Sequence, residues 1–304
     1  AALDALEEIG LADAPSASAE RMVSAGAIRG EDGRIRFPRA LVEDMLGIIE
    51  DVVPIAGGVM CRGEPGQWCN QGIGLGMHGP VSGDDIDRLV AFYESKGIQP
   101  QFELCPFADT SLLMGLGERG FVIREFENTW YRPTPAGLTT EDVLLNAWPT
   151  GNNGEPMRVE VVQPGDEPLL RTAVEVSMAG LVPEGYDFGE SEMSIHRKMV
   201  EMPFCRKIVA WMDGEVIASG GMKSRPPLGA MFGVTVCEPW RKRGVQQALM
   251  AWRLATAAAD GCRTMVIHGT PGEPTERNAQ RMGFRLAYTT PIVVRPGEEL
   301  VASV

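Results

Sequence analysis

Three consecutive cations, Arg241, Lys242 and Arg243, precede Gly244 where an apolar strand pattern gives way to an Ala/Leu-rich helix pattern. The first amide groups of a helix have no partner inside the helix, and the helix dipole adds partial positive charge there. Glycine lets an oxygen approach the backbone closely, and the forked guanidinium group of arginine matches phosphate oxygens. In a chain of formal net charge -13, cations at a helix start indicate an anion site, and a diphosphate is the expected occupant.

The two halves of the chain share a pattern at a fixed spacing. Gly120-Phe121 matches Gly283-Phe284, and Arg132-Pro133 matches Arg295-Pro296, both at an offset of 163 residues. The same offset aligns "PQFELCP" with "RTMVIHG", two short apolar runs typical of strands, and an amphipathic helix pattern precedes each. Two copies of one α/β unit explain this spacing better than a chance similarity of two Gly-Phe corners.

The matching helix start in the first half carries acids instead of cations. In "PVSGDDIDRLV", Ser82 and Asp85 have the spacing of a capping box, and Asp84 and Asp87 add carboxylates to the first turn. These side chains satisfy the helix end internally and repel phosphate. We therefore expect the second copy, and not the first, to bind the anion.

The composition of the chain suggests where the two copies meet. Segment 135–155 is rich in Pro, Gly, Thr and Asn, so we interpret it as a linker, with one short helix, between a domain at 1–134 and a domain at 156–304. In the second domain, Asp213-Gly214 between apolar runs predicts a hairpin. The predicted fold class is α/β (α+β), with a mixed, mostly antiparallel sheet flanked by helices in each domain.

The strand "FGVTVCEPW" followed by "RKRGVQQAL" resembles the acetyl-CoA loop of the GNAT superfamily of N-acetyltransferases, whose pattern is Arg/Gln-x-x-Gly-x-Gly/Ala. Arg241 and Gly244 stand at the first two fixed positions, whereas Gln246 stands where Gly or Ala is usual. "TERNAQRMGF" is similar to the helix that precedes the last strands of that family. The resemblance covers residues 155–296 and extends to the first half through the repeat, which implies two GNAT-like domains.

The resemblance implies a set of cofactor contacts. The loop amides would hold the pyrophosphate of acetyl-CoA, and the pantetheine arm would pair with the preceding strand, 233–236, where two strands separate. The residues so implied are Val234, Val236, Arg241, Arg243, Gly244, Val245, Gln246, Gln247, Asn278 and Arg281. We expect the first domain to be a degenerate copy that binds no CoA.

Proton transfer has several candidate residues in the sequence. Many members of the family carry a Glu on the fourth strand and a Tyr near the closing helix, but "GAMFGVTV" has no carboxylate and Ala279 stands at the Tyr position. Carboxylates of "VPEGYDFGESEMS" are alternatives: Glu184, Asp187, Glu190 and Glu192. The expected catalytic residues are Glu190 as base, with Tyr288 and His268 as further candidates and His196 behind them.

The sequence therefore predicts an acetyl-CoA-dependent N-acetyltransferase that moves an acetyl group to a primary amine of a small molecule or peptide by direct attack. A non-catalytic acyl-CoA-binding or sensor protein is the alternative, and a repeat protein without a ligand explains the basic helix start least well. The acidic balance argues against nucleic acid and anionic membrane as partners. Scattered cysteines and three histidines predict no metal site, and the expected location is the cytoplasm. A homodimer is left open.

Overall fold

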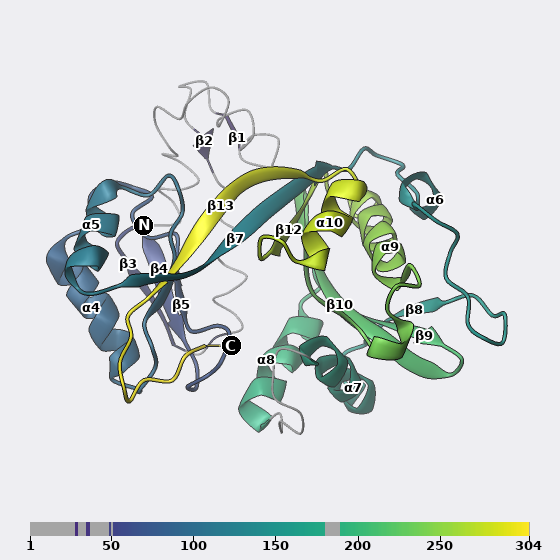
Figure 1. Ribbon diagram of the computed structural model, residues 1–304, viewed down its shortest axis with the longest axis horizontal. Coiled ribbons are helices and arrows are strands. Elements are labelled where there is room, and N and C mark those ends of the chain that lie inside the picture. The colour runs from purple at the N-terminus through teal and green to yellow at the C-terminus, as the bar shows by residue number, and fades with distance from the viewer. Residues whose placement is uncertain (1–27, 30–34, 37–48, 50, 180–188, 304) are drawn as a thin grey trace. The chain divides into compact units, whose positions relative to one another are not determined.

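The computed structural model describes residues 28–29, 35–36, 49, 51–179 and 189–303 (Figure 1). In this part of the chain the fold is α+β, with seven α-helices and, beside the small pair β1 (Ile28–Arg29) and β2 (Ile35–Arg36), a mixed sheet of eleven strands. The helices are α4 (Gly83–Glu94), α5 (Thr110–Glu118), α6 (Thr140–Val143), α7 (Glu167–Met178), α8 (Glu190–Glu201), α9 (Val245–Ala259) and α10 (Pro274–Arg281). The strands are β3 (Asp51–Ile55), β4 (Gly58–Arg62), β5 (Gln71–Ile73), β6 (Gln101–Glu103), β7 (Val122–Pro133), β8 (Arg158–Val161), β9 (Cys205–Met212), β10 (Glu215–Arg225), β11 (Leu228–Val236), β12 (Thr264–Gly269) and β13 (Arg285–Val294).

The chain divides into two compact units. Unit 1 comprises residues 1–129, 269–271 and 286–304, and unit 2 comprises residues 130–268 and 272–285. Most of β13 therefore belongs to unit 1, where Ile292 to Val294 pair antiparallel with β6. The domain boundaries at residues 134 and 156 stay a prediction.

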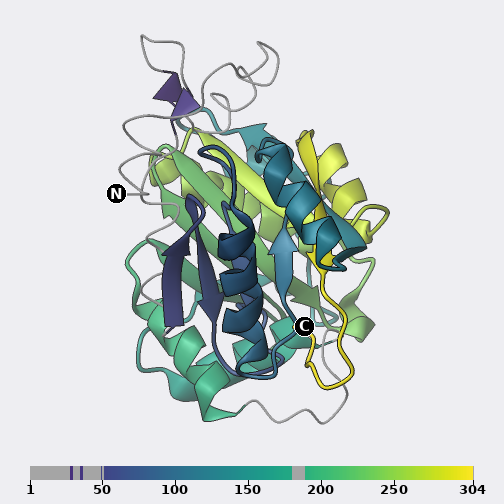
Figure 2. The same ribbon diagram turned by 90° about the vertical axis from the view of Figure 1, so that its left-hand side faces the viewer.

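Unit 1 has strand order β3-β4-β5-β6-β13, and its helices pack on one face of these strands (Figure 2). The pattern of buried side chains on α4, with Ile86, Leu89 and Tyr93 at helical spacing, supplies the helix side of the core. Phe102 of β6 packs against Tyr93 with ring centroids 5.9 Å apart. Apolar periodicity in the sequence is thus sufficient to place α4 on its sheet.

Unit 2 has strand order β12-β11-β10-β9-β8, with helices on both faces (Figure 1). Alternate residues of β9 face opposite sides: Ile208 packs against α9, whereas Val209 packs against α7 and α8. The predicted hairpin at Asp213-Gly214 is confirmed, since Met212 pairs with Glu215 across a turn with positive φ at both central residues. Strand β11 therefore lies between β12 and β10 in a sheet that helices cover on both faces, and there it positions the site described below.

The elements of the two halves begin at nearly the predicted offset. Strand β6 begins at residue 101 and β12 at 264; β7 begins at 122 and β13 at 285. Gly120 and Gly283 both have positive φ directly after their helices, as the Gly-Phe corners predict. This spacing is consistent with a tandem arrangement, while two separate repeated domains stay a prediction.

The start of α4 is capped by its own residues. Ser82 is the N-cap, and its hydroxyl accepts a hydrogen bond from the backbone N–H of Asp85 at 3.1 Å and donates to Asp85 Oδ2 at 2.8 Å. We expect Ser82→Ala to lower the free energy of unfolding by about 1 kcal/mol, because one amide of the first turn loses its partner. Urea unfolding measures the change. Ser82→Asn keeps a side-chain acceptor and should restore stability; equal loss in both variants would contradict the cap.

Candidate functional site

The loop between β11 and α9 leaves the helix start open. After β11 ends at Val236, a single 3-10 turn (Glu238–Trp240) leads to Lys242 with φ +61° and Gly244 with φ +82°. Gly244 is the N-cap of α9, and no side chain caps that end. The first amides of this fifteen-residue helix are therefore available to an anion, unlike those of α4, whose first turn holds Asp84 and Asp85.

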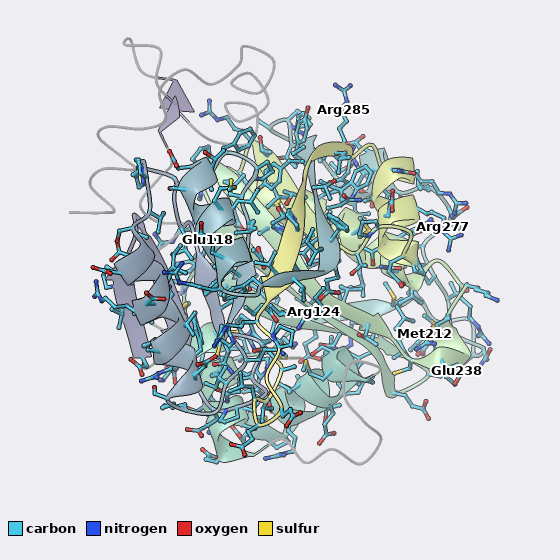
Figure 3. All side chains as sticks on the ribbon, turned by 60° about the vertical axis from the view of Figure 1, so that its left-hand side comes forward. Glu118, Arg124, Met212, Glu238, Arg277 and Arg285 are labelled. Carbon is cyan, nitrogen blue, oxygen red and sulfur yellow. The ribbon has the colours of Figure 1, made fainter. Side chains whose placement is uncertain are left out.

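A cleft of about 900 Å³ lies over this helix start, and every residue that lines it belongs to unit 2. Its charged lining is mainly cationic: Arg241, Lys242, Arg277 and Arg281 face a single carboxylate, that of Glu273. Figure 3 shows the Arg277 side chain projecting outward from α10. In an acidic chain, this concentration of positive charge at a helix N-terminus suits a multiply charged anion.

The strand that forms one wall of the cleft loses a partner midway along its length. Strand β11 pairs in parallel with β12 from Leu228–Thr264 to Met231–Ile267, whereas its pairing with β10 continues to Val236. The register with β12 thus ends before Phe232, and the lining residues 233–236 follow it. A separation of two neighbouring strands exposes backbone N–H and C=O groups that an extended ligand with amide groups can bind.

Nine of the ten predicted cofactor residues line the cleft; Arg243 does not. The Arg243 guanidinium lies 4.7 Å from the ring centroid of Trp240 and donates to Asn152 Oδ1 at 3.2 Å. Lys242, its neighbour, lines the cleft instead. Arg241 donates from Nε to the carbonyl of Val236 at 3.0 Å, which fixes the base of its side chain at the end of β11.

A network of amide side chains connects α9 to α10 and to the predicted linker. Asn278 donates to Gln246 Oε1 at 2.6 Å and accepts from Gln247 Nε2 at 3.2 Å, while Asn146 donates to Gln247 Oε1 at 2.9 Å. Gln246 also donates to the Thr275 hydroxyl at 3.4 Å. The unusual glutamine of the loop therefore directs its side chain toward α10. Asn278 would have to exchange one of these bonds to contact a cofactor.

Glu190 lies at the start of α8, where it forms an ion pair with Arg197. Arg197 also binds Glu167, and its hydrogen bond to Glu190 lowers the pKa of that carboxyl below its ordinary value. Glu190 is exposed and is not among the residues that line the cleft. A paired carboxylate of lowered pKa is a weak base. Glu184 and Asp187 lie outside the described residues, and Glu192 is buried.

The other two catalytic candidates have different surroundings. His268 follows Ile267, the last β12 residue paired with β11, and is exposed, although it does not line the cleft. Tyr288 lies in unit 1, where it packs against Phe107 with ring centroids 6.1 Å apart. Burial raises the pKa of Tyr288, partly offset by a hydrogen bond to Thr129. His268 is thus the candidate next to the strand separation.

Several cleft residues were not predicted. Ser177 and Ala179 come from the end of α7, Asn146 from the predicted linker, and Thr275 and Arg277 from the first turn of α10. Arg277 could have been predicted from the sequence, because it lies one helical turn before Arg281, on the same side of the helix, in the segment that contains Asn278. Nothing in the sequence indicates Ser177 or Asn146 as cleft residues, since their positions depend on packing between distant segments.

Both a family profile and solved structures resemble this chain. Residues 178–284 match the sequence profile of the Acetyltransferase (GNAT) family. A GCN5-related N-acetyltransferase from Kribbella flavida is similar in structure, with a TM-score of 0.58 and 16% identity over 86% of this chain and 96% of that one. A functionally unknown conserved protein from Staphylococcus epidermidis ATCC 12228 has a TM-score of 0.53 and 10% identity over 83% of this chain and 96% of that one. No curated protein matches the chain in sequence.

The profile match includes β11, the loop and α10, so it covers most of the cleft. Residues 178–284 therefore match the GNAT acetyltransferase family in sequence, as the loop pattern predicts, and the similar solved structures share the fold over most of the chain. Among the described residues, no helix is both long and apolar enough for a membrane span. No group of three or more His, Cys, Asp or Glu side chains in that part of the chain could ligate a metal.

Proposed function

We propose that the chain is an acetyl-CoA-dependent N-acetyltransferase whose donor site is the cleft at the start of α9. The single observation that carries the proposal is the uncapped N-terminus of α9 beside Arg241 and Lys242, next to a strand whose register with β12 ends early. The uncapped amides suit the pyrophosphate, and the unpaired stretch of β11 suits the amides of pantetheine. Bound there, the cofactor supplies an acyl thioester.

The residues of this chain divide the work of binding. The amides of Val245, Gln246 and Gln247 would hold the pyrophosphate, with Arg241 and Lys242 adding charge. Gly233, exposed with φ +57°, leaves the strand open where the arm would pass. Arg281 and Asn278 on α10 would contact the cofactor from the opposite wall. In this proposal unit 1 is the degenerate copy and binds no CoA.

The acceptor would be a primary amine of a small molecule or peptide. A lysine-like amine has a pKa of about 10.4, so making its lone pair available at pH 7 costs about 4.6 kcal/mol. A base must therefore accept a proton near the strand separation. His268 stands beside that separation, whereas Glu190 is neutralised by Arg197.

A second candidate is a non-catalytic acyl-CoA-binding protein. The observation in its favour is that β11 carries no carboxylate and that Glu190 is held by Arg197. Such a protein would bind acetyl-CoA in the same cleft without transferring the acetyl group.

Two measurements test the proposal in sequence. Acetyl-CoA at 100 times its Kd should stabilise the chain by about 2.7 kcal/mol in thermal unfolding. Release of free thiol is then followed with a panel of primary amines, for example ethanolamine, spermidine and a lysine peptide. Stabilisation without thiol release above the rate of hydrolysis would favour the binding protein, and no stabilisation would refute both.

A further inference from the structure

A buried lysine lies directly behind the wall of the cleft. Lys207 of β9 is almost entirely buried, and its Nζ donates a hydrogen bond of 2.6 Å to the hydroxyl of Ser177. Lysine is rarely buried this completely in proteins. Ser177 is on α7, and it is itself one of the residues that line the cleft. The pair connects the interior of unit 2 to the donor site.

The strand pairing places this lysine in line with the separation of β11 from β12. Lys207 lies opposite Gly221 of β10, and Gly221 lies opposite Phe232 of β11. Phe232 is the first residue beyond the last β11–β12 pair, Met231–Ile267. Residues directly opposite one another point to the same face of a sheet, so Lys207 and Gly221 share the face that α7 covers.

Glycine at position 221 leaves room for an aromatic ring on that face. A Cβ added to Gly221 would lie 2.2 Å from Cε2 of Phe232, so the Phe232 ring extends over Gly221 toward Lys207. Ser177 is tied to the same region, since Thr235 of β11 donates from its hydroxyl to the Ser177 carbonyl at 2.8 Å. Figure 1 shows α7 and α8 packed together beside β10 in unit 2. Ser177 is itself buried; its hydroxyl accepts from Lys207 Nζ and donates to the Val174 carbonyl at 3.1 Å, so the buried amine is bonded directly to a residue that lines the cleft.

Burial favours the neutral form of Lys207, whereas its neighbour Cys205 favours the charged form. On α8, His196 and Glu192 are both buried and lie one turn apart. On β9, Cys205 is the titratable group that acts on Lys207, and on β10 the residue opposite Lys207 is Gly221. Burial lowers the pKa of Lys207 to about 8. Burial, with the charge of Lys207, lowers the pKa of His196 to about 3, so His196 stays neutral near pH 7. Its Nε2 has no hydrogen-bond partner in the described part of the chain.

We propose that Ser177 and Lys207 form a proton relay that removes a proton from the acceptor amine in the cleft. The relay rests on the proposed acetyl transfer and gives it the base that β11 lacks. Ser177 meets the amine, and Lys207 acts through Ser177.

The proton balance of the relay is complete. The Ser177 hydroxyl, which donates to the Val174 carbonyl in the structure, turns toward the neutral Nζ of Lys207. The acceptor ammonium then gives one proton to the Ser177 oxygen as the Ser177 proton moves to Nζ, leaving an ammonium there. The free amine forms the C–N bond to the thioester carbonyl carbon, and the C–S bond breaks. The departing thiolate takes the second proton from nitrogen, and Lys207 releases its proton to water through Ser177 once the cleft opens to solvent.

The ionisation of Lys207 is measured first, in the full chain and without an acceptor. Lysine labelled with ¹³C at Cε should give one resonance that titrates near pH 8 and is missing from Lys207→Met. Ser177→Ala and added acetyl-CoA should each shift that midpoint, because both alter the hydroxyl or the cleft that it faces. A resonance that titrates near pH 10, or one that neither change moves, would overturn the relay.

Kinetics then separate the relay from a structural role. With an amine active in the thiol assay, Ser177→Ala and Lys207→Met should each lower kcat about 100-fold or more, and the double variant should be no worse. The pH profile of kcat should lose its inflection near pH 8 in Lys207→Met. Lys198→Met on α8 is the matched control and should leave both unchanged.

The two hypotheses fail in different ways. If acetyl-CoA stabilises all variants equally while Lys207→Met and Ser177→Ala keep full activity at every pH, the relay is wrong and acetyl transfer stands. If acetyl-CoA stabilises none of them, the proposed donor site is wrong. Should Lys207→Met fail to fold, Ser177→Ala alone still decides, through its kcat and its effect on the lysine titration.

Discussion

Reversing Arg241 and Lys242 together to glutamate is expected to weaken acetyl-CoA binding by at least about 100-fold. Both side chains line the cleft at the uncapped start of α9. A pair of unit charges 4 Å apart is worth about 4 kcal/mol at an effective dielectric constant of 20. Both groups are exposed, so solvent screens much of this energy, yet reversal replaces two attractions by two repulsions. A loss of about 1.4 kcal/mol at each site already gives the expected factor.

The measurement is the acetyl-CoA concentration needed for half of the maximal rise in Tm. Arg243→Glu is the matched control, because it changes the same charge in the same loop on a side chain held by Trp240 and Asn152 outside the cleft. Its effect should be several-fold smaller than that of Arg241→Glu. Asp84→Ala at the start of α4 should have no effect on binding. An equal loss in Arg243→Glu would mean that the whole basic loop acts through long-range charge, and a loss in Asp84→Ala would move the site to unit 1.

The local features of this site can be predicted from the sequence. A positive-φ glycine at a helix start, cations before it and a hairpin at Asp213-Gly214 depend on backbone conformation within a few residues, and each appears in the structure where the pattern predicts it. The choice between Lys242 and Arg243 as the residue that faces the cleft is not local. It depends on Lys242 adopting φ +61° and on Trp240 offering its ring to Arg243.

Longer-range features could not be predicted from one sequence. Glu190 was expected to act as a base because it belongs to an acidic loop, but Arg197, two turns later on α8, forms an ion pair with it and also binds Glu167 of α7. The Ser177–Lys207 contact joins residues thirty positions apart on a helix and a strand. Residues Ile292 to Val294 of β13 pair with β6 within unit 1, although β13 follows unit 2 in the chain. Each of these contacts is decided by how elements pack, and a periodic pattern carries no information on that choice.

Replacing Arg253 by methionine is expected to raise the free energy of unfolding by about 1–4 kcal/mol. Arg253 is 1% exposed in the middle of α9, where its Nε donates to Leu249 O and its Nη1 to Gly221 O, both at 3.1 Å. Its Nη2 is buried without a hydrogen-bond partner in the described residues. A buried cation without a carboxylate costs more than a well-packed apolar chain of similar length.

The pH dependence of this gain has a defined sign. Burial lowers the pKa of Arg253 to about 9 in the folded chain, so below pH 9 the group is charged in both states and the full cost of burial is present. Above pH 9 the folded state loses the proton first, and the advantage of the methionine variant should shrink. Urea unfolding at pH 7 and pH 10 measures both.

Arg206→Met provides the matched control in the same unit. Arg206 binds both carboxylate oxygens of Asp260, at 2.5 and 3.0 Å, so its replacement should destabilise the chain. Opposite signs for the two substitutions are expected because one arginine has an ionic partner and the other has only backbone carbonyls. If Arg253→Met also destabilises, the bond to Gly221 O must matter more than the buried charge. Gly221 lies between Lys207 and Phe232, so Arg253 would then support the strand row that positions the proposed relay.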